Sequence, residues 1–166
     1  GYTKGINGLI YDVFAPTRDP QASDFTFTNI GKAGTGSTAV SPLATAMIVL
    51  QESNPRRVRM VFTFGDNAVM NTWLKVDVGT GFGANAETHY WGNAVGDVGN
   101  GNTSPNITVT PADELQVRSH PTTALNRSPV TDPNDVNKTS LVDPADQLLV
   151  RSNNTTALNC VKYITR

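Results

Sequence analysis

Oxygen-bearing side chains recur at a regular spacing near the carboxyl end of the 166-residue chain. Numbered from Asp135, they occupy positions 1, 3, 5, 9 and 12, and position 7 offers a backbone carbonyl. The six positions are held by Asp135, Asn137, Thr139, Leu141, Asp143 and Asp146. A twelve-residue loop uses this spacing to surround a hard cation with oxygen ligands. The pattern therefore predicts a Ca²⁺ site.

The second half of this loop also contains the residues that begin a helix. Asp143 suits the N-cap, and Pro144 suits the first helical position. Leu148, Leu149 and Val150 then supply apolar side chains for packing. A side chain at position 9 can therefore cap the helix and also help to bind the ion, directly or through water.

A second copy of the pattern lies 33 residues upstream. Residues 110–126 match residues 143–159 without a gap, and 12 of the 17 positions are identical. Carried back in the same register, the six loop positions become Asn102, Ser104, Asn106, Thr108, Thr110 and Asp113. This first loop has one carboxylate, and Asp97 just upstream could add another. Because affinity for Ca²⁺ follows ligand charge, we expect the second loop to bind more tightly.

Residues 97–160 resemble a type I dockerin, the paired-loop calcium module of secreted bacterial proteins. In that family each EF-hand-like loop is followed by a helix and is not preceded by one. The chain departs from the family at two loop positions. Position 6, usually Gly, holds Ile107 in the first loop and Ser140 in the second. Position 5, usually Asp, holds Asn106 in the first loop and Thr139 in the second. The alternative interpretation is that both loops are decayed and serve only as scaffolds for the helices.

The composition excludes several classes of protein. The net charge is −1, and the 13 basic residues form no run or stripe, which argues against a nucleic-acid partner. No apolar run reaches membrane-spanning length. The single cysteine, Cys160, allows neither an internal disulfide nor a thiolate metal site. Abundant Asn, Thr, Gly, Ser and Pro favour strands and turns over long helices.

The first 96 residues have the pattern of short strands separated by turns. We expect strands at 8–14, 24–28, 46–51, 57–64, 72–78 and 87–91, with 46–51 as a buried strand. Alternation places one set of side chains inward, namely Phe25, Phe27, Val58, Met60, Phe62, Phe64, Leu74, Val76 and Val78. The prediction is a mainly β protein: an antiparallel β-sandwich of the immunoglobulin or cohesin kind in 1–96, the calcium repeats in 97–160, and a strand in 161–166.

Three segments of this first part, 5–10, 23–27 and 90–97, are similar to a module that precedes dockerin-like repeats in large bacterial surface proteins. The resemblance implies an extracellular or cell-surface setting and gives no activity. The last segment, from Cys160 onward, is expected to form a strand. It could pair with its own chain, which is the default, or with a sheet edge of a neighbour.

Catalytic chemistry is not predicted. His89 and His120 belong to no recognised motif, and the acidic residues of the first part are scattered. Three aromatic residues suggest a different activity: Trp73, Tyr90 and Trp91 could form a shelf that stacks on sugar rings. The other interpretation is that Trp73 covers the contact with the repeats while Tyr90 and Trp91 anchor the connection.

Three functions remain open from the sequence. The first is a non-catalytic, calcium-stabilised extracellular structural module that self-associates head-to-tail into a filament or surface array. This hypothesis follows from the resemblance, because a dockerin binds a cohesin, which is itself a β-sandwich. The second is a carbohydrate-binding module of a secreted polysaccharide-degrading system. The third is a dockerin tag that binds a separate extracellular protein module.

Overall fold

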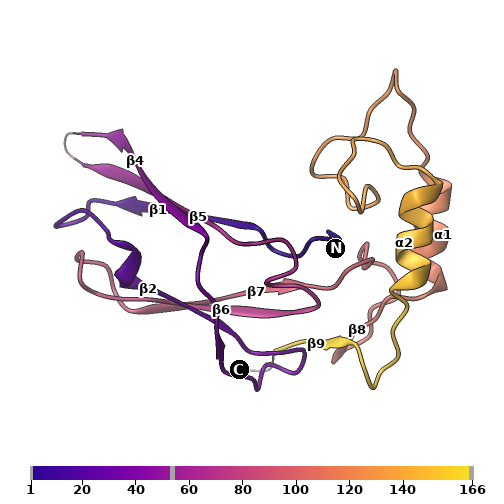
Figure 1. The fold of residues 1–166 in the computed structure, drawn as a ribbon, viewed down its shortest axis with the longest axis horizontal. Coiled ribbons are helices and arrows are strands. Elements are labelled where there is room, and N and C mark those ends of the chain that lie inside the picture. Colours follow the sequence, from indigo (N-terminus) through magenta and orange to yellow (C-terminus); the bar gives the residue numbers. More distant parts are fainter. Residues whose placement is uncertain (1, 53–54, 165–166) are drawn as a thin grey trace.

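The computed structural model describes residues 2–52 and 55–164. Its regular structure is mainly β, with antiparallel strand pairing throughout and two α-helices among the described residues (Figure 1). This confirms the prediction of a mainly β chain. None of the described helices has the length and apolar character needed to cross a lipid bilayer.

Two sheets form the first part of the molecule. The three-stranded sheet has the order β1-β5-β4, with β1 at Gly8–Phe14, β4 at Ala44–Gln51 and β5 at Arg57–Thr63. The four-stranded sheet has the order β3-β2-β6-β7, with β2 at Phe25–Asn29, β3 at Thr38–Ala39, β6 at Thr72–Val78 and β7 at Glu87–Asn93. A short 3₁₀ turn, Ala22–Asp24, precedes β2. The bounds of β1 and β6 are those that alternation predicts.

The main hydrophobic core draws on both sheets, which form two layers in Figure 1. From β5 it takes Val58, Met60 and Phe62, and from β6 it takes Leu74 and Val76. These side chains alternate with half-buried or exposed neighbours along each strand, as a sheet with one buried face requires. The Phe62 ring lies between those of Phe25 and Phe27, at centroid distances of 4.9 Å and 4.8 Å. The predicted inward set is therefore confirmed.

The expectation that residues 46–51 are a buried strand is wrong. They belong to β4, whose residues are all exposed except Val49, which is half-buried. An apolar run is only consistent with a buried strand, because burial depends on what covers the two faces of the sheet. On β4, an edge strand that pairs with β5 alone, side chains of both faces are exposed.

A second hydrophobic cluster lies between the helices and the loops that precede them. Helices α1 (Pro111–Ser119) and α2 (Pro144–Ser152) lie side by side, apart from the sheets (Figure 1). The buried members of this cluster are all valines: Val98, Val109, Val117, Val136, Val142 and Val150.

The two ends of the chain join the sheets to the repeats. The last strand, β9 (Val161–Lys162), pairs antiparallel with β8 (Asn106–Ile107), and the Lys162 N–H donates to the Lys32 carbonyl at 2.8 Å. Near the amino end, the Thr3 N–H donates to the Val136 carbonyl at 3.2 Å. The last strand thus pairs within its own chain; residues 165–166 of the expected strand lie outside the described residues.

Candidate metal-binding loops

The second loop ends in a helix cap of the predicted kind. Asp143 has extended backbone angles, and its side chain accepts a hydrogen bond from the Ala145 N–H at 2.7 Å. Pro144 occupies the first turn, and Oδ2 of Asp146 accepts from the Asp143 N–H at 3.1 Å. The two carboxylates form a reciprocal capping box. The predicted start of α2 at Pro144 is confirmed.

Two buried carboxylates organise the remainder of this loop. Oδ1 of Asp146 accepts from the Val136 and Asn137 N–H groups at 2.8 Å and 3.0 Å. The two oxygens of Asp135 accept from the Thr139 and Ser140 N–H groups at 3.0 Å and 2.8 Å. Asp135 is 1% exposed and Asp146 is 0% exposed. The beginning and the end of the loop are therefore held together by acidic side chains.

Burial raises the pKa of Asp146 above its ordinary value, and the nearby Asp135 carboxylate raises it further. Hydrogen bonds from Asp143, Asn137 and Val136 act in the opposite direction. Within the described part of the chain, neither Asp135 nor Asp146 forms an ion pair with Lys or Arg. Buried charges in proteins are otherwise paired or bound to metals, so this pair of carboxylates suits a cation.

The other oxygens of the loop come from neutral groups. Oδ1 of Asn137 accepts from the Thr139 N–H at 3.0 Å, and Oγ1 of Thr139 lies 3.4 Å from the Leu141 carbonyl. Ser140 occupies position 6 with a φ of 69°, so the sharp turn forms there without glycine. No group of three or more His, Cys, Asp or Glu side chains in residues 2–52 and 55–164 is placed to hold a metal. The residues fit Ca²⁺ only if neutral oxygens complete the ligand set.

The first loop has a different register from the one that a gap-free repeat predicts. The Val98 N–H donates to Oδ1 of Asp113 at 3.2 Å, as the Val136 N–H donates to Asp146 in the second loop. Asp97 therefore takes the place of Asp135. The first loop runs for seventeen residues, from Asp97 to Asp113, against twelve in the second. The repeated Asp-Val pair was the sequence signal that could have revealed the insertion.

This insertion separates the predicted ligands of the first loop. Nδ2 of Asn102 donates to Asp97 at 3.0 Å, and Oδ1 of Asn102 accepts from the Thr108 N–H at 2.9 Å. Ser104 is exposed, and Asn106 lies in β8, where it accepts from Nζ of Lys162 at 2.5 Å. Thr110 and Asp113 form the capping box of α1. The structure thus groups Asp97 with Asn102, and Thr110 with Asp113, and leaves Ser104 and Asn106 outside.

The two repeats exchange hydrogen bonds that follow their internal symmetry. The Val109 N–H donates to Oγ1 of Thr155 at 2.8 Å, and the Val142 N–H donates to Oγ1 of Thr122 at 2.7 Å. Each threonine N–H returns a bond to the carbonyl of the same valine, at 2.9 Å and 3.1 Å. Each loop is therefore tied to the segment after the other helix. The sequence patterns assign no role to these threonines.

One polar contact between the helices breaks this symmetry. Glu114 of α1 accepts from Nε of Arg151 at 3.1 Å and from Nε2 of Gln147 at 2.8 Å. These donors, Arg151 first, lower the pKa of Glu114 to about 2. The equivalent of Glu114 in α2 is the neutral Gln147, so the contact has no charged counterpart.

The three aromatic candidates do not form one shelf. Trp73 is half-buried, its Nε1 donates to the Lys162 carbonyl at 2.7 Å, and its ring packs on Gly92. Tyr90 pairs with Lys75, on the face of the sheet that carries Trp73, whereas Trp91 pairs with the buried Leu74 and so lies on the other side. The position of Trp73 agrees with the interpretation that it covers the contact with the repeats.

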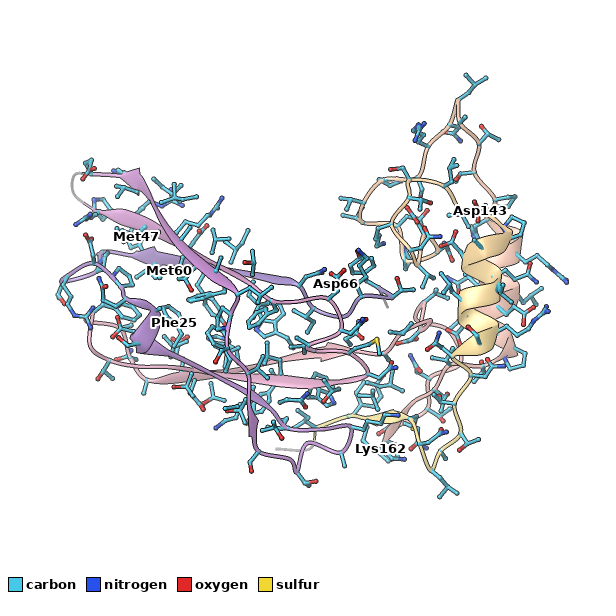
Figure 2. The ribbon with its side chains drawn as sticks, viewed as in Figure 1. Phe25, Met47, Met60, Asp66, Asp143 and Lys162 are labelled. Carbon is cyan, nitrogen blue, oxygen red and sulfur yellow. The ribbon has the colours of Figure 1, made fainter. Side chains whose placement is uncertain are left out.

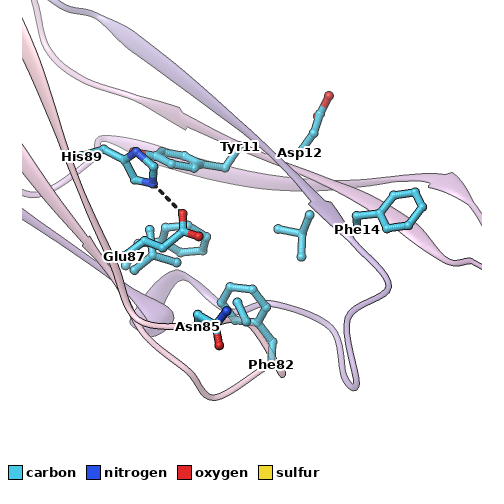
Figure 3. A pocket seen from close by; sticks show the side chains of 11 residues that line it. Tyr11, Asp12, Phe14, Phe82, Asn85, Glu87 and His89 are labelled. Atoms are coloured by element: carbon cyan, nitrogen blue, oxygen red, sulfur yellow. Dashed lines mark hydrogen bonds and ion pairs between the residues drawn. The ribbon is translucent and has the colours of Figure 1, made fainter.

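A pocket of ≈ 180 Å³ lies between the edges of β1 and β7 (Figure 3). Tyr11, Phe82, Asn85 and Glu87 are among its lining residues, with His89 bonded to Glu87 at 3.1 Å. The Tyr11 hydroxyl accepts from Nε1 of Trp91 at 3.2 Å. The pocket is the open side of the main core, and it has no nucleophile–base pair. The other histidine, His120, lies after α1 and contacts the Gln116 carbonyl at 2.8 Å.

Comparison with known proteins gives no relative for this chain: no family model, no curated protein and no solved structure matches it.

Proposed function

We propose that this chain is a non-catalytic, calcium-stabilised structural module of the cell exterior that associates with copies of itself. The carrying observation is the pair of buried carboxylates, Asp135 and Asp146, at the two ends of one loop (Figure 2 labels Asp143 of this loop). Within the described residues, neither carboxylate forms an ion pair with Lys or Arg. The dockerin-like spacing and the predicted β-sandwich belong to the same proposal.

An extracellular setting fits the modest charge of the loop. A Ca²⁺ loop with fewer carboxylate ligands binds the ion more weakly, and modules outside the cell work with dissociation constants of roughly 10⁻⁴–10⁻³ M. The second loop replaces the usual aspartate at position 5 with Thr139. Such a loop would be filled at the millimolar Ca²⁺ of extracellular fluids. Residues Asp135, Asn137, Thr139, Leu141, Asp143 and Asp146 would supply its oxygens.

In this proposal the ion stabilises the fold through the contacts of the loop. Val136, the second residue of the loop, is in the valine cluster, and its carbonyl accepts from the amino-terminal Thr3. Neutralising Asp135 and Asp146 would therefore favour the packed arrangement of both helices and the amino-terminal segment. This role needs no catalytic residue.

The test is a thermal melt of the full chain in millimolar Ca²⁺ and in EGTA, with molecular mass measured by light scattering in both. We expect a higher melting temperature and a higher mass in Ca²⁺. The effect of Ca²⁺ should weaken on acidification, because protons compete for Asp146 and its pKa is raised. Mg²⁺ at the same concentration is the control. Identical melts in Ca²⁺ and EGTA would refute the calcium role.

A further inference from the structure

The edge strand β4 has the features of an interface. It lies at the outer side of the three-stranded sheet (Figure 1). From Ala44 to Gln51 it contains no charged residue and no proline, which are common protections of edge strands. Its apolar side chains are exposed, Met47 by 40% and Ile48 by 47%. A register irregularity between Val49 and Gln51 affects only the end of the strand.

The register shows which backbone groups of β4 are unused by β5. The Phe64 N–H, just after β5, donates to the Asn7 carbonyl on the β1 side at 2.9 Å. Successive residues of an antiparallel strand bond to opposite neighbours, so Val61 and Arg59 bond towards β4. Their partners are Ala46 and Ile48. The backbone groups of the alternate residues, Thr45, Met47 and Val49, therefore point away from the sheet.

We propose that β4 pairs antiparallel with β4 of a second copy of this chain, centred near Met47, and so joins two three-stranded sheets into one of six strands. The inference names the surface used for the proposed self-association, and it rests on that function. A symmetric antiparallel pair satisfies the outward backbone groups of both strands at once.

The side chains of β4 favour a second copy as the occupant. Centred on Met47, the pair sets Thr45 opposite Val49, and Glu52 opposite Pro42 of the other copy. No like charges meet, so a symmetric pair has no repulsive contact along the strand. Met47 meets its own equivalent, and an unbranched thioether adapts well to such a site. A foreign strand would gain nothing from this symmetry.

The test uses the full chain in saturating Ca²⁺ over a range of protein concentrations. Sedimentation should show a dimer, and amide hydrogen exchange by NMR should slow at Thr45, Met47 and Val49 as concentration rises. The amides of Ala46 and Ile48 should be protected at every concentration. A wild-type chain that stays monomeric up to millimolar concentration overturns the inference. Hydrogen exchange at Thr45, Met47 and Val49 that does not change with protein concentration also overturns it.

Variants on the two edges of the same sheet separate this surface from others. Met47→Pro removes an outward N–H of β4, and edge strands tolerate proline there, so we expect dimerisation to weaken at least tenfold. Ile10→Pro removes an outward N–H of β1 and is the matched control. If Met47→Pro fails to fold, Ile48→Lys and Ile10→Lys form a second pair. Equal effects at both edges overturn the inference, whereas a calcium-independent melt refutes only the calcium role.

Discussion

The two repeats of this chain have nearly the same helix and very different loops. Both helices begin with a capping box and have proline as their first residue. Both also bury a valine at the equivalent position, Val117 in α1 and Val150 in α2. The second loop closes in twelve residues around Asp135 and Asp146. The first has five more residues, and its segment Asn106–Ile107 forms β8, which pairs with β9. The second loop thus encloses two buried carboxylates, whereas the first takes part in a tertiary contact with the last strand.

The difference between the loops should be largest in the response to calcium. Asp135→Asn removes a buried carboxylate of the second loop, and Asp97→Asn removes its counterpart in the first. Wild-type protein should gain about 2.7 kcal/mol of unfolding free energy at 100 times the dissociation constant. We expect Asp135→Asn to lose most of this gain and Asp97→Asn to keep most of it. Chemical denaturation with and without Ca²⁺ measures both, and equal losses would contradict the distinction.

The helices, in contrast, should respond alike to truncation. Val117→Ala and Val150→Ala each remove two buried methyl groups from the same cluster, at a cost of about 2 kcal/mol each. Urea unfolding measures this cost. Leu148→Ala, at an exposed position of α2, is the control and should change stability by less than about 0.5 kcal/mol. Costs for the two valines that differ by more than about 1 kcal/mol would show that the repeats are not equivalent.

Substitutions at left-handed backbone positions should change stability in opposite directions in the two loops. Ser140 in the second loop has a φ of 69°, a conformation that glycine adopts more readily, so Ser140→Gly should stabilise the chain by about 1 kcal/mol. Gly99 in the first loop has a φ of 92°, and a Cβ there would meet no atom within 4 Å. Gly99→Ala should therefore destabilise by about 1 kcal/mol through strain alone. Opposite signs in thermal melts support this account, and the same sign for both would refute it.

The smallest effect should come from the contact between Glu114 and Arg151. The pKa of Glu114 is about 2 in the folded chain, below its ordinary 4.5. A carboxylate with a lowered folded pKa stabilises the fold above the unfolded pKa, and this contribution disappears as the pH falls from about 4.5 to about 2. Glu114→Gln should remove that part of the acid dependence and cost little at pH 7, because Arg151 is exposed. Unfolding free energies across this pH range are the measurement. Identical profiles for variant and wild type would exclude the contribution.

Local signals predicted well those features that depend on neighbouring residues. The cap at Asp143 and the inward faces of β5 and β6 follow from side-chain types a few positions apart. The loop register did not follow, because alternating Asn, Ser and Thr between Asn102 and Thr110 imitate ligand spacing. The gap-free match covered only the helix and the segment after it, so it held no information on an insertion before the helix.

The remaining features required contacts between distant segments. Trp73 bonds to Lys162, β8 pairs with β9, and Val142 bonds to Thr122 across the repeats. The exposure of β4 likewise depends on which strands stand beside it. Periodicity and capping act within one turn or one strand, so the sequence alone determined the start of α2 and the inward faces of β5 and β6. The neighbours of each element follow from the packing of the whole chain, and only the tertiary structure shows that Asp97 lies beside Asn102 and that β4 lies at an edge.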